Sequence, residues 1–113
     1  SNPIEPLNAY RTALVGVREE RAMLRRDLSN CYSAPRDSRW GEDALPEPML
    51  RHFFSFFIDE YSRVFDPACG EGNSLRAAES LGAELTIGLE QDKELAMEGN
   101  DAMRTFRMLR SLR

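Results

Sequence analysis

Residues 63–81, which include the motif DPACGEG, constrain the fold of this chain more than any other stretch. The short apolar run RVFD ends in Asp66, a loop containing Gly70 and Gly72 follows, and residues 73–81 have the apolar spacing of a helix. Glycines in such a loop let the backbone approach a ligand without a Cβ collision. Because ligands bind at the carboxyl ends of strands in open α/β sheets, this order predicts a binding edge at Asp66.

The following residues repeat the pattern of a strand and then a helix. Gly82 stands just past the first helix, where a C-cap glycine belongs. Residues 85–90 (LTIGLE) predict a second strand, again ending in an acid. The last predicted helix runs from Asp92 to about Leu112, and its apolar seam steps by four, three, four and three through Leu95, Gly99, Ala102, Phe106 and Leu109. Strand, helix, strand and helix in fewer than about fifty residues predict a right-handed parallel unit.

A further helix is predicted before the first strand, over residues 46–58. Pro46 and Pro48 suit a first helical turn, and apolar residues then recur at helical spacing up to Ile58. The apolar stripe is broad, so we expect this helix to be mostly buried. His52 is the only histidine, and a packing or surface role explains it better than catalysis.

Residues 1–45 have weaker patterns. Residues 9–26 favour a β-hairpin, with a short helix as the alternative for its second arm. Residues 28–45 have no period and read as a loop or linker. Arg36 and Arg39, with Trp40 beside them, could contact a phosphate backbone, although surface arginines around a half-buried tryptophan are the commoner arrangement.

The length of the chain and its cysteines exclude several classes of protein. At 113 residues the chain suits one small domain and is too short for a complete two-domain enzyme. No apolar run approaches the roughly 18–20 residues of a membrane helix. Cys31 and Cys69 stand too far apart for a disulfide framework or a cysteine-pair zinc site. We therefore expect a cytoplasmic protein with no membrane partner and no metal.

Charge is unevenly distributed along the chain. Residues 46–92 contain three basic and nine acidic residues, a net of −6, within a chain whose net charge is −4. This acidic stretch is either a solvated face or a site for a cationic, hydroxyl-rich ligand. It argues against nucleic-acid binding by this chain alone, because phosphate contacts need clustered Lys and Arg.

The spacing of the acids indicates which ligand would suit the predicted edge. Glu90 ends the second strand, 18 residues beyond Gly72, where a carboxylate can accept hydrogen bonds from both ribose hydroxyls. Leu75 replaces the third glycine of a dinucleotide motif, and Asp66 and Glu71 would repel a pyrophosphate. These features favour S-adenosylmethionine (SAM), which carries a ribose, an ammonium and a sulfonium, over NAD or ATP. The alternative is a strand–helix–strand unit whose turn is merely rich in glycine.

Residues 65–96, FDPACGEGNSLRAAESLGAELTIGLEQDKELA, resemble the cofactor-binding motifs of class I SAM-dependent methyltransferases. More narrowly, they resemble the DNA amino-methyltransferases that modify adenine N6 or cytosine N4. In that family a helix led by Lys-Pro precedes an Asp-Pro-x-x-Gly-x-Gly loop, and residues 46–72 have this order. The resemblance covers residues 46 to about 112. Residues 12–25 are similar to the terminal strand pair that precedes this helix in permuted members of the family.

The resemblance implies a role for each residue of the predicted edge. Asp66 would bind the ammonium group, directly or through water, and Glu90 would bind the ribose. Gln91 or Asp92 would lie beside the adenine. The backbone of the loop would cradle the methionine part of SAM, through Pro67, Ala68, Cys69, Gly70 and Gly72.

Two departures from the family limit what this chain can do. Leu45 stands where the family often has lysine, and no two of the six prolines adjoin, so the Pro-Pro catalytic motif is absent. That motif orients the target amine and stacks the flipped base, so we assign no catalytic residue. We expect a partial Rossmann-like methyltransferase fold of about four strands, where a complete sheet of this kind needs about seven.

These features predict one compact domain with two parts. Residues 1–45 would form the hairpin and linker, and residues 46–113 the SAM-binding unit. The chain would be a carboxyl-terminal piece, a truncated homologue or one half of a split enzyme, inactive alone and reaching DNA through a separate catalytic half. We also expect a homodimer, formed through the Phe-rich helix or the seam from Leu95 to Leu109. The alternative is a non-catalytic interaction module that kept the methyltransferase half-fold.

Overall fold

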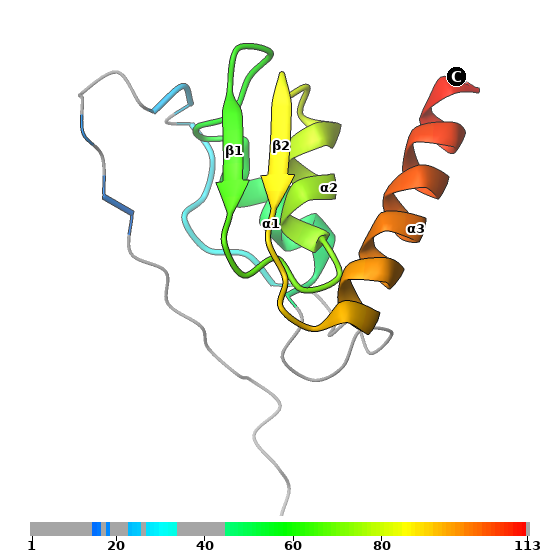
Figure 1. The fold of residues 1–113 in the computed structure, drawn as a ribbon. Helices are drawn as coiled ribbons and strands as arrows, with labels where there is room; N and C mark the ends of the chain where they lie inside the picture. The colour runs from blue at the N-terminus through cyan, green and yellow to red at the C-terminus, as the bar shows by residue number, and fades with distance from the viewer. Residues whose placement is uncertain (1–14, 17, 19–22, 26, 34–44, 113) are drawn as a thin grey trace, which may run out of the picture.

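The computed structural model describes residues 15–16, 18, 23–25, 27–33 and 45–112. Three helices and two strands alternate along this part of the chain (Figure 1). In chain order they are α1 (Glu47–Phe54), β1 (Arg63–Asp66), α2 (Asn73–Ser80), β2 (Leu85–Gly88) and α3 (Lys93–Ser111).

The two strands are parallel and in register. Arg63 pairs with Leu85 at one end, and Asp66 pairs with Gly88 at the other. The predicted parallel strand–helix–strand–helix unit is therefore confirmed, as a small α/β unit compatible with a partial Rossmann-like fold. The described residues contain two strands rather than about four. Of the predicted hairpin, residues 15–16, 18 and 23–25 are not in a strand, and the rest lies outside the described residues.

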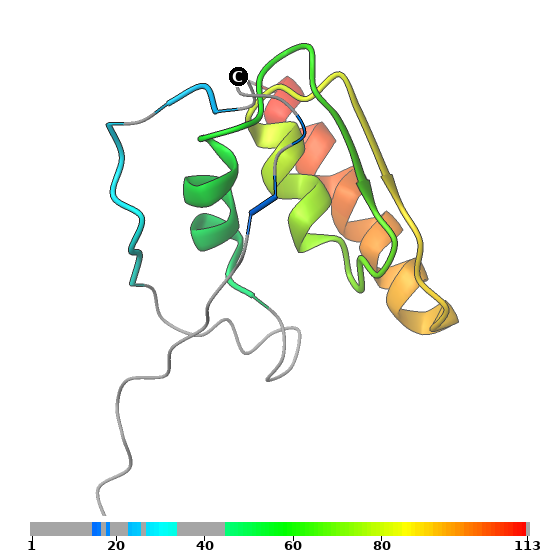
Figure 2. The ribbon, with the colours of Figure 1, turned by 90° about the vertical axis from the view of Figure 1, so that its left-hand side faces the viewer.

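Helix α2 packs on one face of the sheet, and α1 packs against α2 on the side away from the strands (Figure 2). Exposure alternates along both strands, so Val64 and Thr86 face the helices while Phe65 and Ile87 face solvent. The opposite face of the sheet carries no helix among the described residues (Figures 1 and 2). Since parallel sheets are normally covered on both faces, this is an unusual exposure of apolar surface.

The predicted burial of the first helix is wrong. α1 ends at Phe54 rather than Ile58, and none of its residues is fully buried. Phe56, in the turn that follows, is 8% exposed and shares the buried apolar core of the described residues with Ala77 and Ala78 of α2. With helices on one face of two short strands, there is too little covering structure to enclose a whole phenylalanine-rich helix.

His52 has a packing role, as predicted. Its ring stacks on Tyr32 at a centroid distance of 4.9 Å and meets Phe53 edge-on, and its Nε2 lies 2.8 Å from the Ser29 carbonyl oxygen. The Leu24 N–H donates to the Phe56 carbonyl oxygen at 2.6 Å. Through these contacts, residues 23–25 and 27–33 pack against α1 and the turn after it. Arg36, Arg39 and Trp40 lie outside the described residues.

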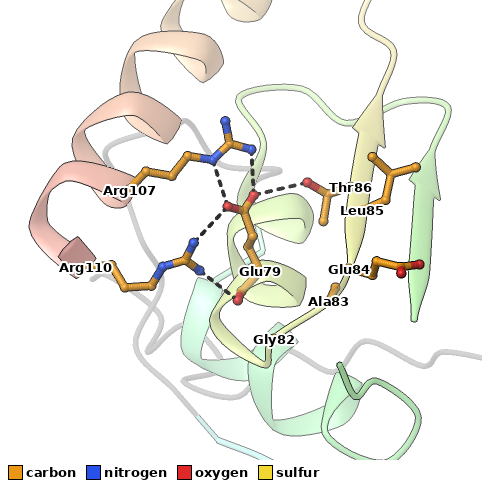
Figure 3. A pocket seen from close by; sticks show the side chains of 8 residues that line it. All are labelled: Glu79, Gly82, Ala83, Glu84, Leu85, Thr86, Arg107 and Arg110. Atoms are coloured by element: carbon orange, nitrogen blue, oxygen red, sulfur yellow. Dashed lines mark hydrogen bonds and ion pairs between the residues drawn. The ribbon is translucent and has the colours of Figure 1, made fainter. Parts of the chain in front are cut away.

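The carboxyl-terminal half of α3 is held by the ion pairs of Glu79 with Arg107 and Arg110, called the ionic clasp from here on. Glu79 of α2 accepts two hydrogen bonds from Arg107, at 2.8 and 2.9 Å, and a weaker one from Arg110 at 3.3 Å (Figure 3). Thr86 of β2 donates to the same carboxylate at 3.2 Å. The predicted seam of α3 is half-buried at Leu95, Gly99, Ala102 and Phe106. The half-buried part of the seam ends at Phe106, because Leu109 is 58% exposed. The clasp, rather than the seam, therefore holds the end of α3 in place.

Candidate functional site

The two loops that follow β1 and β2 run side by side at the carboxyl edge of the sheet. Beyond the last paired residues, the Leu89 N–H donates to the Asp66 carbonyl oxygen at 2.9 Å. The Cys69 N–H donates to the Leu89 carbonyl oxygen, also at 2.9 Å. The parallel register therefore brings Asp66 and Glu90, which are 24 residues apart, to the same edge, as the sequence predicts.

Glu90 bridges these two loops through its carboxylate. Oε1 accepts a hydrogen bond from the Gly70 N–H at 3.0 Å, and Oε2 accepts one from the Asp92 N–H at 2.7 Å. The two bonds hold this half-buried side chain in one orientation. Each carboxylate oxygen can accept more than one hydrogen bond, so the group can still receive hydroxyl donors from a ligand.

Asp66 is fixed by its own loop and by α2. Its Oδ1 accepts from the Ala68 N–H at 3.0 Å, and its Oδ2 accepts a short hydrogen bond from the Ser74 hydroxyl. The side chain therefore stands at the point where strand, loop and helix meet. A carboxylate held there without a cationic side-chain partner among these contacts suits a ligand ammonium group.

The two glycines of the loop adopt backbone conformations that other residues avoid. Gly70 has φ of 54° and Gly72 has φ of 89°. Gly72 is also the N-cap of α2, and a Cβ added there would lie 3.2 Å from Nη1 of Arg76. These backbone conformations favour glycine at both positions. The backbone bends back on itself, and the Gly72 N–H donates to the Cys69 carbonyl oxygen at 2.9 Å.

The side chain of Cys69 packs over β2. A Cβ built on Gly88 would lie 2.5 Å from Cys69 Sγ and 2.6 Å from Leu75 Cδ1, so Gly88 leaves the room that these side chains fill. Burial raises the pKa of the Cys69 thiol, with Asp66 and then Glu90 and Glu71 adding to the effect. The thiol of Cys69 therefore has a packing role. The backbone of Cys69, rather than its sulfur, is part of the candidate site.

A shallow groove of about 510 Å³ lies along this edge. It is lined by Pro67 and Ala68 from the first loop and by Leu89, Glu90 and Gln91 from the second. The two loops, residues 66–72 and 89–92, contain four carboxylates and no basic residue. Of these four carboxylates, Glu90 is the one that lines the groove, and Pro67, Ala68 and Leu89 give it apolar walls.

Asp92, predicted with Gln91 to lie beside the adenine, caps α3. Its Oδ1 accepts from the Glu94 and Leu95 N–H groups at 3.0 and 3.2 Å, which makes it the N-cap of α3. It does not line the groove, whereas its neighbour Gln91 does. An Asp immediately before a helix is a standard capping signal, so the sequence already contained the means to distinguish the two residues.

The sequence patterns did not indicate Arg76, which holds the loop of the site through a hydrogen bond to its backbone. Arg76 is 5% exposed; it donates to the Glu71 carbonyl oxygen at 2.7 Å and to the Glu47 carboxylate of α1 at 3.2 Å. It also donates to the amide oxygen of Asn73, whose own amide nitrogen donates to the Leu45 carbonyl oxygen at 2.8 Å. The only signal in the sequence was the spacing of Asn73 and Arg76, which puts them on one helix face.

The chain was compared with known families, proteins and structures. No family model, curated protein or solved structure matches it. The assignment of a function therefore depends on the geometry and chemistry of this edge. In the part of the chain that the structure describes, none of the helices combines the length and apolarity needed to cross a bilayer.

Proposed function

We propose that this chain is the SAM-binding portion of a DNA amino-methyltransferase. The observation that carries the proposal is that Glu90 lines a groove at the carboxyl edge of parallel strands and accepts a hydrogen bond from the Gly70 N–H, while Asp66 is held at the start of the same loop. Glu90 in the groove, the left-handed glycines and the held carboxylate of Asp66 match the chemistry that a ribose with a cationic methionine side chain requires.

Each residue has a binding task in this proposal. Glu90, oriented by the Gly70 and Asp92 N–H groups, accepts the ribose hydroxyls. Asp66 offers its carboxylate to the ammonium group, directly or through water. Pro67, Ala68 and Leu89 line the groove and would supply apolar contacts, and Gln91, which also lines it, would lie beside the adenine. The cofactor supplies an electrophilic methyl group on a sulfonium, which the exocyclic amine of adenine or cytosine attacks directly.

The chain would hold the methyl donor and leave the target base to another polypeptide or segment. It has no Pro-Pro motif, so we assign no catalytic residue to it. The net charge of −6 over residues 46–92 also opposes contact with a phosphate backbone. We therefore infer that DNA is engaged through a separate catalytic half.

One observation favours a second candidate, a non-catalytic interaction module. The solvent-facing side of the sheet exposes apolar residues on both strands, including Phe65 at 59% and Ile87 at 47%. Such a surface is typical of protein contacts. The two candidates differ in whether the groove binds a nucleoside.

Titration calorimetry with SAM tests the proposal directly. We expect saturable binding to the wild-type chain, at least a tenfold weaker Kd for Glu90→Ala, and no change for Glu84→Ala, an exposed acid at the opposite end of β2. Absence of heat at millimolar SAM would overturn the cofactor assignment and favour the module. Binding that Glu90→Ala leaves unchanged would show that the ribose lies elsewhere.

A further inference from the structure

We propose that Arg107 and Arg110 of α3 bind the phosphate group of a small ligand, in a pocket at the end of the sheet opposite the groove. The pocket has a volume of about 430 Å³ and lies where the last turns of α2 and α3 meet the start of β2 (Figure 3). It is called the arginine pocket from here on. The proposal is independent of the SAM assignment, because the arginine pocket and the groove share no lining residue.

Two guanidinium groups share one carboxylate in the arginine pocket. Glu79 accepts from Arg107 Nε and Nη2 at 2.8 and 2.9 Å, and from Arg110 Nη2 at 3.3 Å. The charges of these three side chains sum to +1. Glu84, the other acid that lines the pocket, points away from the two arginines (Figure 3) and pairs with Arg63 at 2.9 Å. The residues that line the pocket therefore leave a positive charge that no carboxylate among them neutralises.

Both arginines keep N–H groups that can bind a ligand. A guanidinium carries five N–H donors in one plane. Arg107 uses two of them on the Glu79 carboxylate, and Arg110 uses one there and one on the Glu79 carbonyl oxygen at 3.0 Å. The remaining donors make no hydrogen bond to a residue in the described part of the chain. Because the two side chains are 55% and 45% exposed, a ligand can reach these donors from solvent.

The two guanidinium groups are oriented before a ligand arrives. Glu79 is itself fixed, since its side chain is only 11% exposed and its Oε2 also accepts from the Thr86 hydroxyl at 3.2 Å. Arg110 lies over the Phe106 ring, 5.2 Å from its centroid. Long side chains held in this way lose less conformational entropy on binding than free ones do. Glu79 is thus a positioning residue for the two arginines.

A phosphate group suits this pair better than a carboxylate does. It offers three oxygens and up to two negative charges, so it can accept charge-assisted hydrogen bonds from both guanidinium groups at once. A nucleic acid suits the pair less, because backbone binding needs basic side chains along several phosphates. The chain carries a net charge of −6 over residues 46–92, which include most of the pocket lining. These features favour a small ligand with one phosphate group.

An NMR titration of the isotope-labelled full chain with inorganic phosphate, at constant ionic strength, tests the site. We expect saturable shifts at Thr86 and Arg107 with a Kd on the order of 1 mM, and no shifts at Gly70 or Glu90. Absence of saturable shifts in the arginine pocket would overturn the proposal. Shifts confined to the loops of the groove would overturn it as well.

Two variants and a control identify the donors. Arg110→Met is expected to weaken phosphate binding at least tenfold, while the pair of Arg107 with Glu79 keeps α3 in place. Arg110→Lys keeps the charge but not the planar fork, so we expect an intermediate loss. Arg104→Met removes an exposed arginine of the same helix and is expected to leave the Kd unchanged. Equal weakening by Arg104→Met and Arg110→Met would reduce the effect to net charge and would overturn the proposal.

Two further probes identify the source of the phosphate group. Glycerol phosphate that binds as tightly as inorganic phosphate supports a phosphorylated molecule as the ligand, and weaker binding of this ester supports free phosphate. A short DNA duplex is expected to bind no more tightly than inorganic phosphate. If the duplex binds at least tenfold more tightly and Arg110→Met abolishes that gain, the two arginines contact a nucleic-acid backbone, and the assignment to a small ligand is wrong.

Discussion

The Gly70 N–H donates a hydrogen bond to Glu90 Oε1 at 3.0 Å and so joins the loop after β1 to the loop after β2. Because Glu90 also receives the Asp92 N–H at 2.7 Å, one carboxylate fixes both walls of the groove. The residue assigned to the ribose is thus also a structural element, and the loops are held in place before any ligand arrives. This preorganisation lowers the conformational entropy lost on binding.

The first prediction concerns the structural part of this role. Glu90→Ala removes two partly buried, charge-assisted hydrogen bonds, so we expect it to lower the free energy of unfolding by about 2 kcal/mol. Glu90→Gln retains an acceptor and is expected to lose less. Urea denaturation checks both values, with Glu94→Ala, an exposed acid on α3, as the control. Equal stabilities of Glu90→Ala and the wild type would mean that the bridge contributes nothing to the fold.

Among the charged residues, we expect replacement of Arg76 to cause the largest loss of stability. Arg76→Met leaves the Glu71 carbonyl oxygen and the Glu47 carboxylate without this donor in a buried setting, at a cost of about 3–5 kcal/mol. In a domain with so small a core, that loss would unfold most of the population at 25 °C. Circular dichroism melting checks this outcome.

The matched control is Arg104→Met on α3. Arg104 pairs with Asp101 at 3.3 Å, and both side chains are more than 70% exposed, so we expect a change within about 0.5 kcal/mol. A similar loss of stability in the two variants would contradict the importance assigned to burial of Arg76.

Stability is expected to fall in acid through protonation of Glu79. The Arg107 guanidinium, followed by smaller contributions from Thr86 and Arg110, holds the pKa of Glu79 below its ordinary value of 4.5. The folded chain therefore binds the proton less tightly than the unfolded chain does. The clasp contributes fully above the ordinary pKa, and its contribution is lost as pH falls through the lowered one.

The measurement is a set of thermal melts of the wild type and Glu79→Gln from pH 7 to pH 3. We expect Glu79→Gln to be less stable at pH 7 and the difference from the wild type to shrink below pH 4.5. Glu84→Gln, which changes an acid in an exposed pair, should show little difference at neutral pH. A difference in melting temperature between the wild type and Glu79→Gln that does not change with pH would contradict the stabilising role assigned to the clasp.

Gly88→Ala is expected to destabilise the chain by overpacking. The new Cβ would lie 2.5 Å from Cys69 Sγ and 2.6 Å from Leu75 Cδ1, which forces these side chains to move at a cost of about 1–3 kcal/mol. Gly16→Ala is the control, because nothing lies within 4 Å of the position where its Cβ would be. Chemical denaturation compares the two, and equal stabilities would show that Cys69 and Leu75 can rearrange freely.

The amino-acid sequence determined the order of elements and the edge at which the candidate site lies. Periodicity located the two strands and the three helices between residues 47 and 111, and the left-handed turns fall on Gly70, Gly72 and Gly82. These features are local, since each depends on residues a few positions apart. The parallel register then brings Asp66 and Glu90 together without further information.

Only the tertiary structure decided which distant side chains meet. The pair of Arg76 with Glu47 and the clasp of Glu79 with Arg107 join residues 28 or 29 positions apart. Their formation depends on how helices cross in space, and no periodicity encodes that. The same reason explains three further features. Helix α1 is shorter than predicted, the seam of α3 is exposed at its end, and one face of the sheet is open. Two strands with helices on one face enclose too little volume to bury every apolar residue that local patterning offers.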